Sequence, residues 1–214
     1  MSIARFSWHR FYAVLLLLCV SFSANAALEE GNQYRVIPQK AAVNTEGKIE
    51  VLEFFSYGCP HCATLAAPVA AWEKKLPKDV VLVRVPVAWG RPAWEALGRA
   101  YYTLDALGAH EVSEKAFDAV QHQNVDLSDE KVFLDWVSKN GIDRKKAQDT
   151  YRSFAVAGKI KQGQSLEKDY RVQEVPHFYV DGKYEINMRA FNKEEAFFKG
   201  IEEVINKVRQ ERKK

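Results

Sequence analysis

Two cysteines with two residues between them are the part of this sequence best suited to chemistry. They belong to the segment Cys59-Pro60-His61-Cys62. At this spacing two thiols lie one helical turn apart and can close a disulfide, and a thiolate can attack a disulfide of another molecule. The segment therefore predicts a redox site formed by Cys59 and Cys62.

The flanking residues predict where Cys59 lies. Residues 51–55 form a short, mainly apolar run typical of a buried strand, and residues 56–58 predict a turn. Pro60 suits the first position of a helix, which we expect to continue to about Leu76. Cys59 would then lie at a helix N-terminus, where unpaired N–H groups and the helix dipole stabilise a thiolate. This placement favours Cys59 as the attacking thiol.

Residues 1–26 have the pattern of an export signal. Arg5 and Arg10 precede an apolar segment over residues 11–20, and Ala24-Asn25-Ala26 supplies the small residues of a cleavage site. The apolar segment is too short for a permanent membrane anchor. We therefore expect an exported chain of 188 of the 214 residues, without stable membrane insertion.

Removal of the signal leaves Cys59 and Cys62 as the only cysteines, because Cys19 lies within it. A structural disulfide is one alternative, but so short a loop would contribute little stability. Zinc is another, and it would need two further ligands. The remaining histidines form no paired ligand motif; they are His61, His110, His122 and His177. We therefore favour redox chemistry and expect no metal and no cofactor.

The charge balance argues against a nucleic-acid partner. The signal holds two of the 31 basic residues and none of the 28 acidic ones, which leaves 29 basic residues against 28 acidic ones. A protein that binds nucleic acid or an anionic membrane surface usually carries a clear positive excess. We expect neither partner here.

The first part of the chain, residues 27–91, has an α/β pattern. Residues 34–37 could form an edge strand, and the β-branched run at residues 80–87 follows the helix that begins at Pro60. Strand, helix and strand in this order predict a right-handed parallel unit. Cys59 would emerge at the C-terminal end of its first strand, where open α/β sheets place their sites.

Residues 92–170 contain only helical patterns, so we expect an all-helical insert. Ser128 and Asp143 are the expected N-caps of two of its helices. Strand patterns return in residues 171–214, where Asp181-Gly182 predicts a hairpin turn and Asn192 is the expected N-cap of a last helix.

Several segments together resemble the DsbA family of periplasmic thiol:disulfide oxidoreductases. They are the export signal, residues 51–56 leading into Cys59-Pro60-His61-Cys62, Val175-Pro176 before the late hairpin, and residues 180–184 (Val-Asp-Gly-Lys-Tyr). The resemblance implies a thioredoxin fold interrupted by an inserted all-helical domain. It also implies donation of the disulfide to reduced exported polypeptides, and reoxidation by a quinone-linked membrane oxidase such as DsbB.

The resemblance also implies roles for individual residues. Cys59 matches the nucleophile that forms mixed disulfides, and Cys62 matches the resolving thiol. Pro60 and His61 match the dipeptide that tunes thiolate stability. Pro176 matches a cis-proline beside the disulfide, which would leave the backbone of Val175 free to pair with a substrate chain.

Glu53 lies within the buried run, where a carboxylate is costly without a partner or a task. A solvated strand face is the alternative environment. In the family an acidic residue here assists proton movement for the resolving thiol, and Arg84 matches its partner. The better-known members of the family have Lys at the position of Arg84. A lysine can give up a proton, whereas an arginine cannot.

Other positions admit two interpretations. His177 follows the proline, where a small or apolar residue is more usual, and could act on the disulfide or simply pack. Tyr57, Trp89 and Trp94 are candidates for an apolar docking surface or for the core.

Two other functions compete with disulfide donation. A periplasmic reductase or isomerase needs similar residues, although residues 27–48 leave no room for the dimerisation domain of exported isomerases. A chaperone-like binding module with an inert disulfide belongs to a different class. We expect a monomeric disulfide donor in the periplasm.

Overall fold

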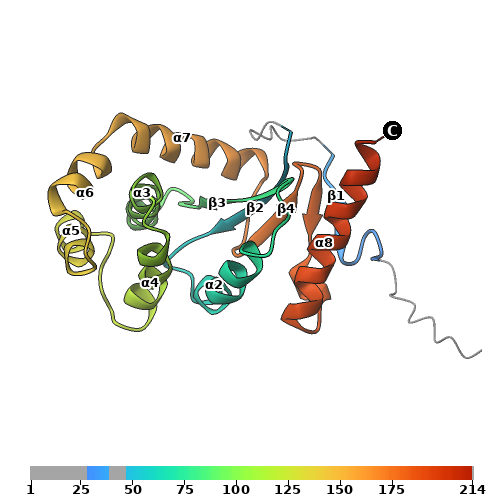
Figure 1. Cartoon of the computed structure of the whole chain (residues 1–214), viewed down its shortest axis with the longest axis horizontal. Helices are drawn as coiled ribbons and strands as arrows, with labels where there is room; N and C mark the ends of the chain where they lie inside the picture. Colours follow the sequence, from blue (N-terminus) through green and yellow to red (C-terminus); the bar gives the residue numbers. More distant parts are fainter. Residues whose placement is uncertain (1–27, 39–46, 214) are drawn as a thin grey trace, which may run out of the picture.

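The computed structural model describes residues 28–38 and 47–213 (Figure 1). The expected export signal lies outside the described residues. None of the described helices is long and apolar enough to cross a membrane.

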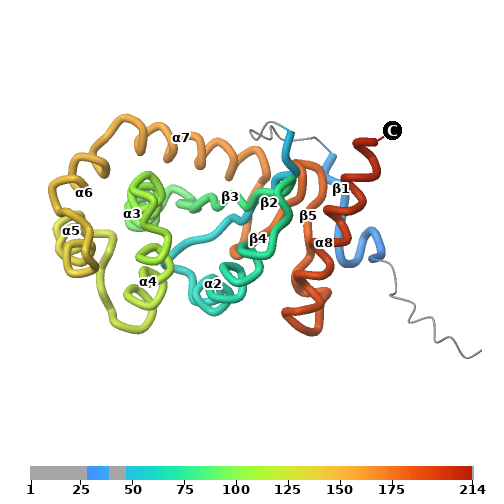
Figure 2. Tube along the Cα trace, in the orientation of Figure 1, coloured from blue at the N-terminus to red at the C-terminus, as the bar shows by residue number. Residues whose placement is uncertain are grey.

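A five-stranded sheet forms the centre of the molecule, in the order β1-β5-β4-β2-β3 (Figure 2). β2 and β3 are parallel, and the other neighbouring strands are antiparallel. The predicted parallel strand–helix–strand unit and edge strand are confirmed. The strands are β1 (Tyr34–Val36), β2 (Ile49–Phe55), β3 (Val80–Pro86), β4 (His177–Val180) and β5 (Tyr184–Ile186).

β2 is buried along its whole length because helices cover both faces of the sheet. Val51 packs in a cluster with residues of α2 (Pro60–Glu73) and α8 (Glu194–Glu211). Leu52 and Phe54 point to the opposite face and pack with Tyr170 and Tyr179. Successive strand residues alternate between faces, so Glu53 lies on the face that α2 covers.

The helices α3 to α7 lie between β3 and β4 in the chain and gather beside the sheet (Figure 1). Their core includes Leu104, Phe133 and Val137, and it is continuous with Phe55 and both cysteines. The helical segment therefore supports the site directly. The helices are α3 (Pro92–Ala106), α4 (His110–Gln121), α5 (Glu130–Lys139), α6 (Arg144–Tyr151) and α7 (Phe154–Asp169).

The helix caps confirm one prediction and correct two. Asp143 caps α6 by accepting a hydrogen bond from the Lys146 N–H. Ser128 is wrong as the cap of α5, because Asp129 takes that place and the Ser128 hydroxyl bonds to Asp126 instead.

The last helix also begins later than predicted. Asn192 is not its N-cap; α8 starts at Glu194, after Lys193, with no side-chain cap. Glu194 and Glu195 in the first turn complement the positive end of the helix dipole. The predicted hairpin turn is confirmed, with Asp181 and Gly182 both at positive φ.

Two helical glycines allow a matched test of packing against α8. A Cβ at Gly200 would lie 2.5 Å from the Phe191 ring, whereas a Cβ at Gly158 would meet nothing within 4 Å. We expect Gly200→Ala to lower the free energy of unfolding by ~1–3 kcal/mol through overpacking. Gly158→Ala should raise it by ~0.5–1 kcal/mol, because alanine favours the helix. Urea titrations would measure both, and equal effects would contradict the packing described.

Candidate functional site

Cys59 is the N-cap of α2, and Pro60 occupies the first turn, as predicted. The Cys59 sulfur accepts a hydrogen bond from the backbone N–H of Cys62 at 3.3 Å. Cys59 keeps 6% of its surface exposed and Cys62 keeps 1%. A second sulfur is therefore one helical turn behind the first and further from solvent.

The environment separates the acidities of the two thiols. The pKa of Cys59 is lowered to about 6, first by a hydrogen bond from the Cys62 thiol and then by backbone N–H groups of Cys62 and His61 and the charge of His61. Burial opposes this shift. For Cys62, burial is the main cause of a raised pKa, and the neighbouring Cys59 adds to it. At neutral pH Cys59 is thus mainly a thiolate and Cys62 a thiol.

The segment before β4 faces the cysteines. The Val175–Pro176 peptide bond is cis, which confirms the expectation. The Val175 carbonyl oxygen lies 3.4 Å from the Cys59 sulfur and accepts a hydrogen bond from its thiol form. Val175 therefore borders Cys59 through its backbone.

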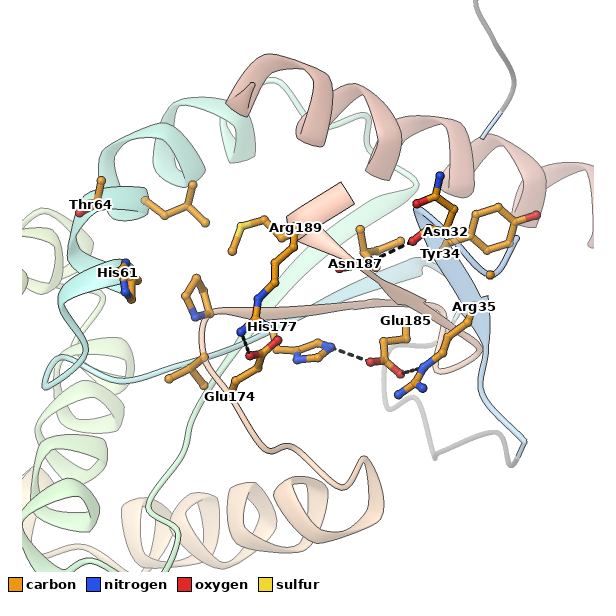
Figure 3. A pocket seen from close by; sticks show the side chains of 16 residues that line it. Asn32, Tyr34, Arg35, His61, Thr64, Glu174, His177, Glu185, Asn187 and Arg189 are labelled. Atoms are coloured by element: carbon orange, nitrogen blue, oxygen red, sulfur yellow. Dashed lines mark hydrogen bonds and ion pairs between the residues drawn. The ribbon is translucent and has the colours of Figure 1, made fainter. Parts of the chain in front are cut away.

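A groove of about 590 Å³ runs alongside His61 and Pro176 (Figure 3). Its lining combines apolar side chains with charged pairs: Arg189 forms an ion pair with Glu174, and His177 Nε2 lies 3.0 Å from Glu185 Oε1. The groove residues come from β1 and the turn before it, from α2, from the start of β4 and the segment that leads into it, from β5, and from the turn of 3₁₀ helix at Met188–Ala190. The sequence analysis missed both contacts, and only the antiparallel pairing of β4 with β5 would have suggested the second one.

His177 packs in this groove. Its ring stacks on Tyr179 with a centroid separation of 4.9 Å and pairs with Glu185, which also bonds to Arg35. These contacts favour the packing interpretation of His177.

The three aromatic residues considered for a docking surface lie in different environments. Tyr57 is buried, packs against Phe117 and bonds through its hydroxyl to Ser113, so it belongs to the core and is wrong as a docking residue. Trp89 and Trp94 are partly exposed and pack together at 5.3 Å.

Glu53 is buried and pairs with Arg84, its register partner on β3. The Arg84 Nε donates to Glu53 Oε2 at 2.9 Å, so the predicted partner is confirmed. Burial raises the pKa of Glu53 to about 7, and Arg84 opposes the shift. Arg84 also meets Glu114 and Glu73, two contacts that the sequence analysis missed.

Known proteins resemble this chain over nearly its whole length. A family model described as a DSBA-like thioredoxin domain matches residues 50–199. The thiol:disulfide interchange protein DsbA of Pseudomonas syringae pv. tomato is 37% identical over 194 residues, covering 90% of each chain. DsbA of Pseudomonas aeruginosa is 34% identical over 185 residues, covering 86% of this chain and 87% of that protein.

Solved structures agree. The crystal structure of Pseudomonas aeruginosa DsbA has a TM-score of 0.82 at 33% identity and covers 87% of this chain and 97% of its own. The oxidoreductase NmDsbA1 from Neisseria meningitidis has a TM-score of 0.79 at 30% identity, covering 88% and 98%. With its paired thiols at the start of α2 and its helices inserted into a thioredoxin fold, the chain belongs to the DsbA family of thiol:disulfide oxidoreductases.

Proposed function

We propose that the protein donates its Cys59–Cys62 disulfide to reduced exported polypeptides in the periplasm, acting as a monomer. The contrast between the two thiols carries this proposal, because a stable Cys59 thiolate makes the dithiol a good product. The relatives named DsbA are thiol:disulfide interchange proteins, which supports the same class of chemistry.

The proposed reaction proceeds through a mixed disulfide. A substrate thiolate attacks the Cys59 sulfur, and the Cys59–Cys62 bond breaks with its electron pair moving to Cys62. Cys62 takes up a proton because the pKa of its buried thiol is raised, mainly by burial. A second substrate thiolate attacks the substrate sulfur of the mixed disulfide and releases the Cys59 thiolate. A DsbB-like, quinone-linked membrane oxidase would then reoxidise the dithiol.

The neighbouring residues have supporting roles in this proposal. Pro60 lies in the first turn of α2, where a backbone N–H would have no partner within the helix, so its missing N–H costs no hydrogen bond. His61 stabilises the Cys59 thiolate through its backbone N–H and its charge. Val175, held before the cis Pro176, would pair its backbone with the substrate chain beside Cys59. Glu53 would supply and remove the proton of Cys62.

Single-cysteine variants test the roles of the two sulfurs. Cys59→Ser should abolish oxidation of a reduced, unfolded dithiol protein. Cys62→Ser should instead accumulate mixed disulfides through Cys59, because the second thiol is missing. Non-reducing gels and mass spectrometry of the cross-linked peptide would identify the sulfur.

Two results would contradict the roles assigned. Complexes trapped through Cys62 in Cys59→Ser would reverse them. An absence of any oxidation by the native protein would favour an inert disulfide.

The titration of Cys59 tests the order of its stabilising contacts. Thiolate absorbance near 240 nm should give a midpoint near pH 6 for the native protein. Cys62→Ala removes the strongest contact and should raise this midpoint more than His61→Ala, which leaves the backbone N–H groups in place. A larger effect of His61→Ala would show that the imidazole charge dominates instead.

The same thiolate predicts a pH-dependent stability difference. The folded pKa of Cys59 is about 6, below the unfolded value of about 8.5, so the thiolate stabilises the reduced form fully above pH 8.5, and this stabilisation is lost as pH falls through 6. Between pH 5 and pH 8 the reduced form should gain about 2.5 kcal/mol relative to the oxidised form.

Loop closure should stabilise the oxidised form by about 2 kcal/mol at any pH, so the two forms should be equally stable at about pH 7.5. Paired urea titrations of both forms measure the difference, and a pH-independent value would contradict it.

A further inference from the structure

One arginine beneath the redox site holds three carboxylates. Arg84 Nε is 2.9 Å from Glu53, Nη1 is 3.0 Å from Glu114 and Nη2 is 3.2 Å from Glu73. The three acids come from β2, α4 and α2, so the contacts join three separate elements to β3. Their side chains keep 4%, 30% and 42% of their surfaces exposed, in that order. The cluster thus extends from the core towards the surface.

The charges of this cluster do not balance when all groups are ionised. One guanidinium faces three carboxylates, which leaves an excess of two negative charges in a cluster whose inner end, at Glu53, is buried. Such an excess is relieved when a carboxylate takes up a proton. Glu53 is the most buried of the three and gains most from this. Burial first, and then the charges of Glu114 and Glu73, raise the pKa of Glu53, while Arg84 lowers it.

Arg84 itself cannot pass on a proton, because a guanidinium stays protonated in proteins. Arg84 favours the charged form of the Glu53 carboxylate, whereas burial and the charges of Glu114 and Glu73 favour its protonated form. We propose that Glu114, together with Glu73, is a positioning residue for proton transfer at Cys62: by sharing Arg84 with Glu53, the two acids leave Glu53 free to gain and lose a proton. This inference rests on the proposed function, in which Glu53 serves Cys62.

Other groups also face this cluster. α2 contributes Cys62, and burial together with the nearby Glu53 raises the pKa of that thiol. Tyr101 interacts electrostatically with Arg84, Lys74 interacts with Glu114, and Tyr57 interacts with both. Asp105 lies further out and interacts with Tyr57 and Tyr101. None of them bonds to Arg84 as Glu114 does, so Glu114 is the residue to test.

Ellman's reagent separates the two thiols in one experiment. The Cys59 thiolate attacks the reagent disulfide, forms a mixed disulfide and releases one thionitrobenzoate. Cys62 then gives its proton to the Glu53 carboxylate and attacks the Cys59 sulfur. That bond to the reagent breaks, a second thionitrobenzoate leaves, and the protein disulfide forms. Stopped-flow absorbance therefore shows a first phase for Cys59 and a second phase for Cys62.

In the native protein the rate of the second phase should rise with a midpoint near pH 7, where Glu53 loses its proton. Glu114→Gln should move this midpoint down by about one pH unit, because one repelling charge is removed. Glu73→Gln should move it less, since Glu73 is more exposed. The first phase should keep its own midpoint in both variants.

Control variants make the result decisive. Glu111→Gln, one turn earlier on the same helix and exposed, should leave both phases unchanged. Glu114→Asp keeps the charge and should restore the second midpoint. The proposal is overturned if Glu114→Gln leaves the second midpoint in place, or moves both phases equally, while Glu53→Gln alters the second phase. A native protein that releases only one thionitrobenzoate, with Cys62 left unreacted, would instead overturn the proposed function.

Discussion

The complete burial of β2 is the constraint on which the rest of the site depends. Helices α2 and α8 cover one of its faces, and a cluster that contains Tyr170 and Tyr179 covers the other. The strand therefore holds the turn that leads to Cys59 rigidly at its end. It also places the Glu53 carboxylate where water does not reach it, so that the charge must be met by Arg84 or removed by a proton.

The helical segment is part of the site rather than an appendage. α4 supports the turn before Cys59, because Gln121 donates to the Tyr57 carbonyl at 2.6 Å and Ser113 bonds to the Tyr57 hydroxyl. The same helix brings Glu114 to Arg84. Both the position of the Cys59 sulfur and the charge beneath Cys62 thus depend on residues more than fifty positions further along the chain.

The local sequence pattern was sufficient to predict the main helices and strands and the redox pair Cys59 and Cys62. The apolar run of β2 and the proline after Cys59 predict a strand and a helix start, and both are present. The Glu53–Arg84 pair was implied by the family resemblance, and the parallel register of β2 and β3 places the two residues side by side. The sequence predicted the N-caps of the helices less accurately. Ser128 and Asp129 both carry side chains that can cap a helix, and only the path of the chain decides that Asp129 caps α5.

The sequence by itself determined which residues could carry chemistry, because thiol spacing and helix-start signals are local properties. Tertiary structure alone decided their surroundings. It buried Tyr57 against α4, it lined the groove with Glu174, Arg189 and other charged residues, and it gathered three acids on Arg84. Such contacts join residues from separate elements, and no spacing along the chain encodes them. They depend on how helices and strands pack, which is also what sets the charge and solvation around the two sulfurs.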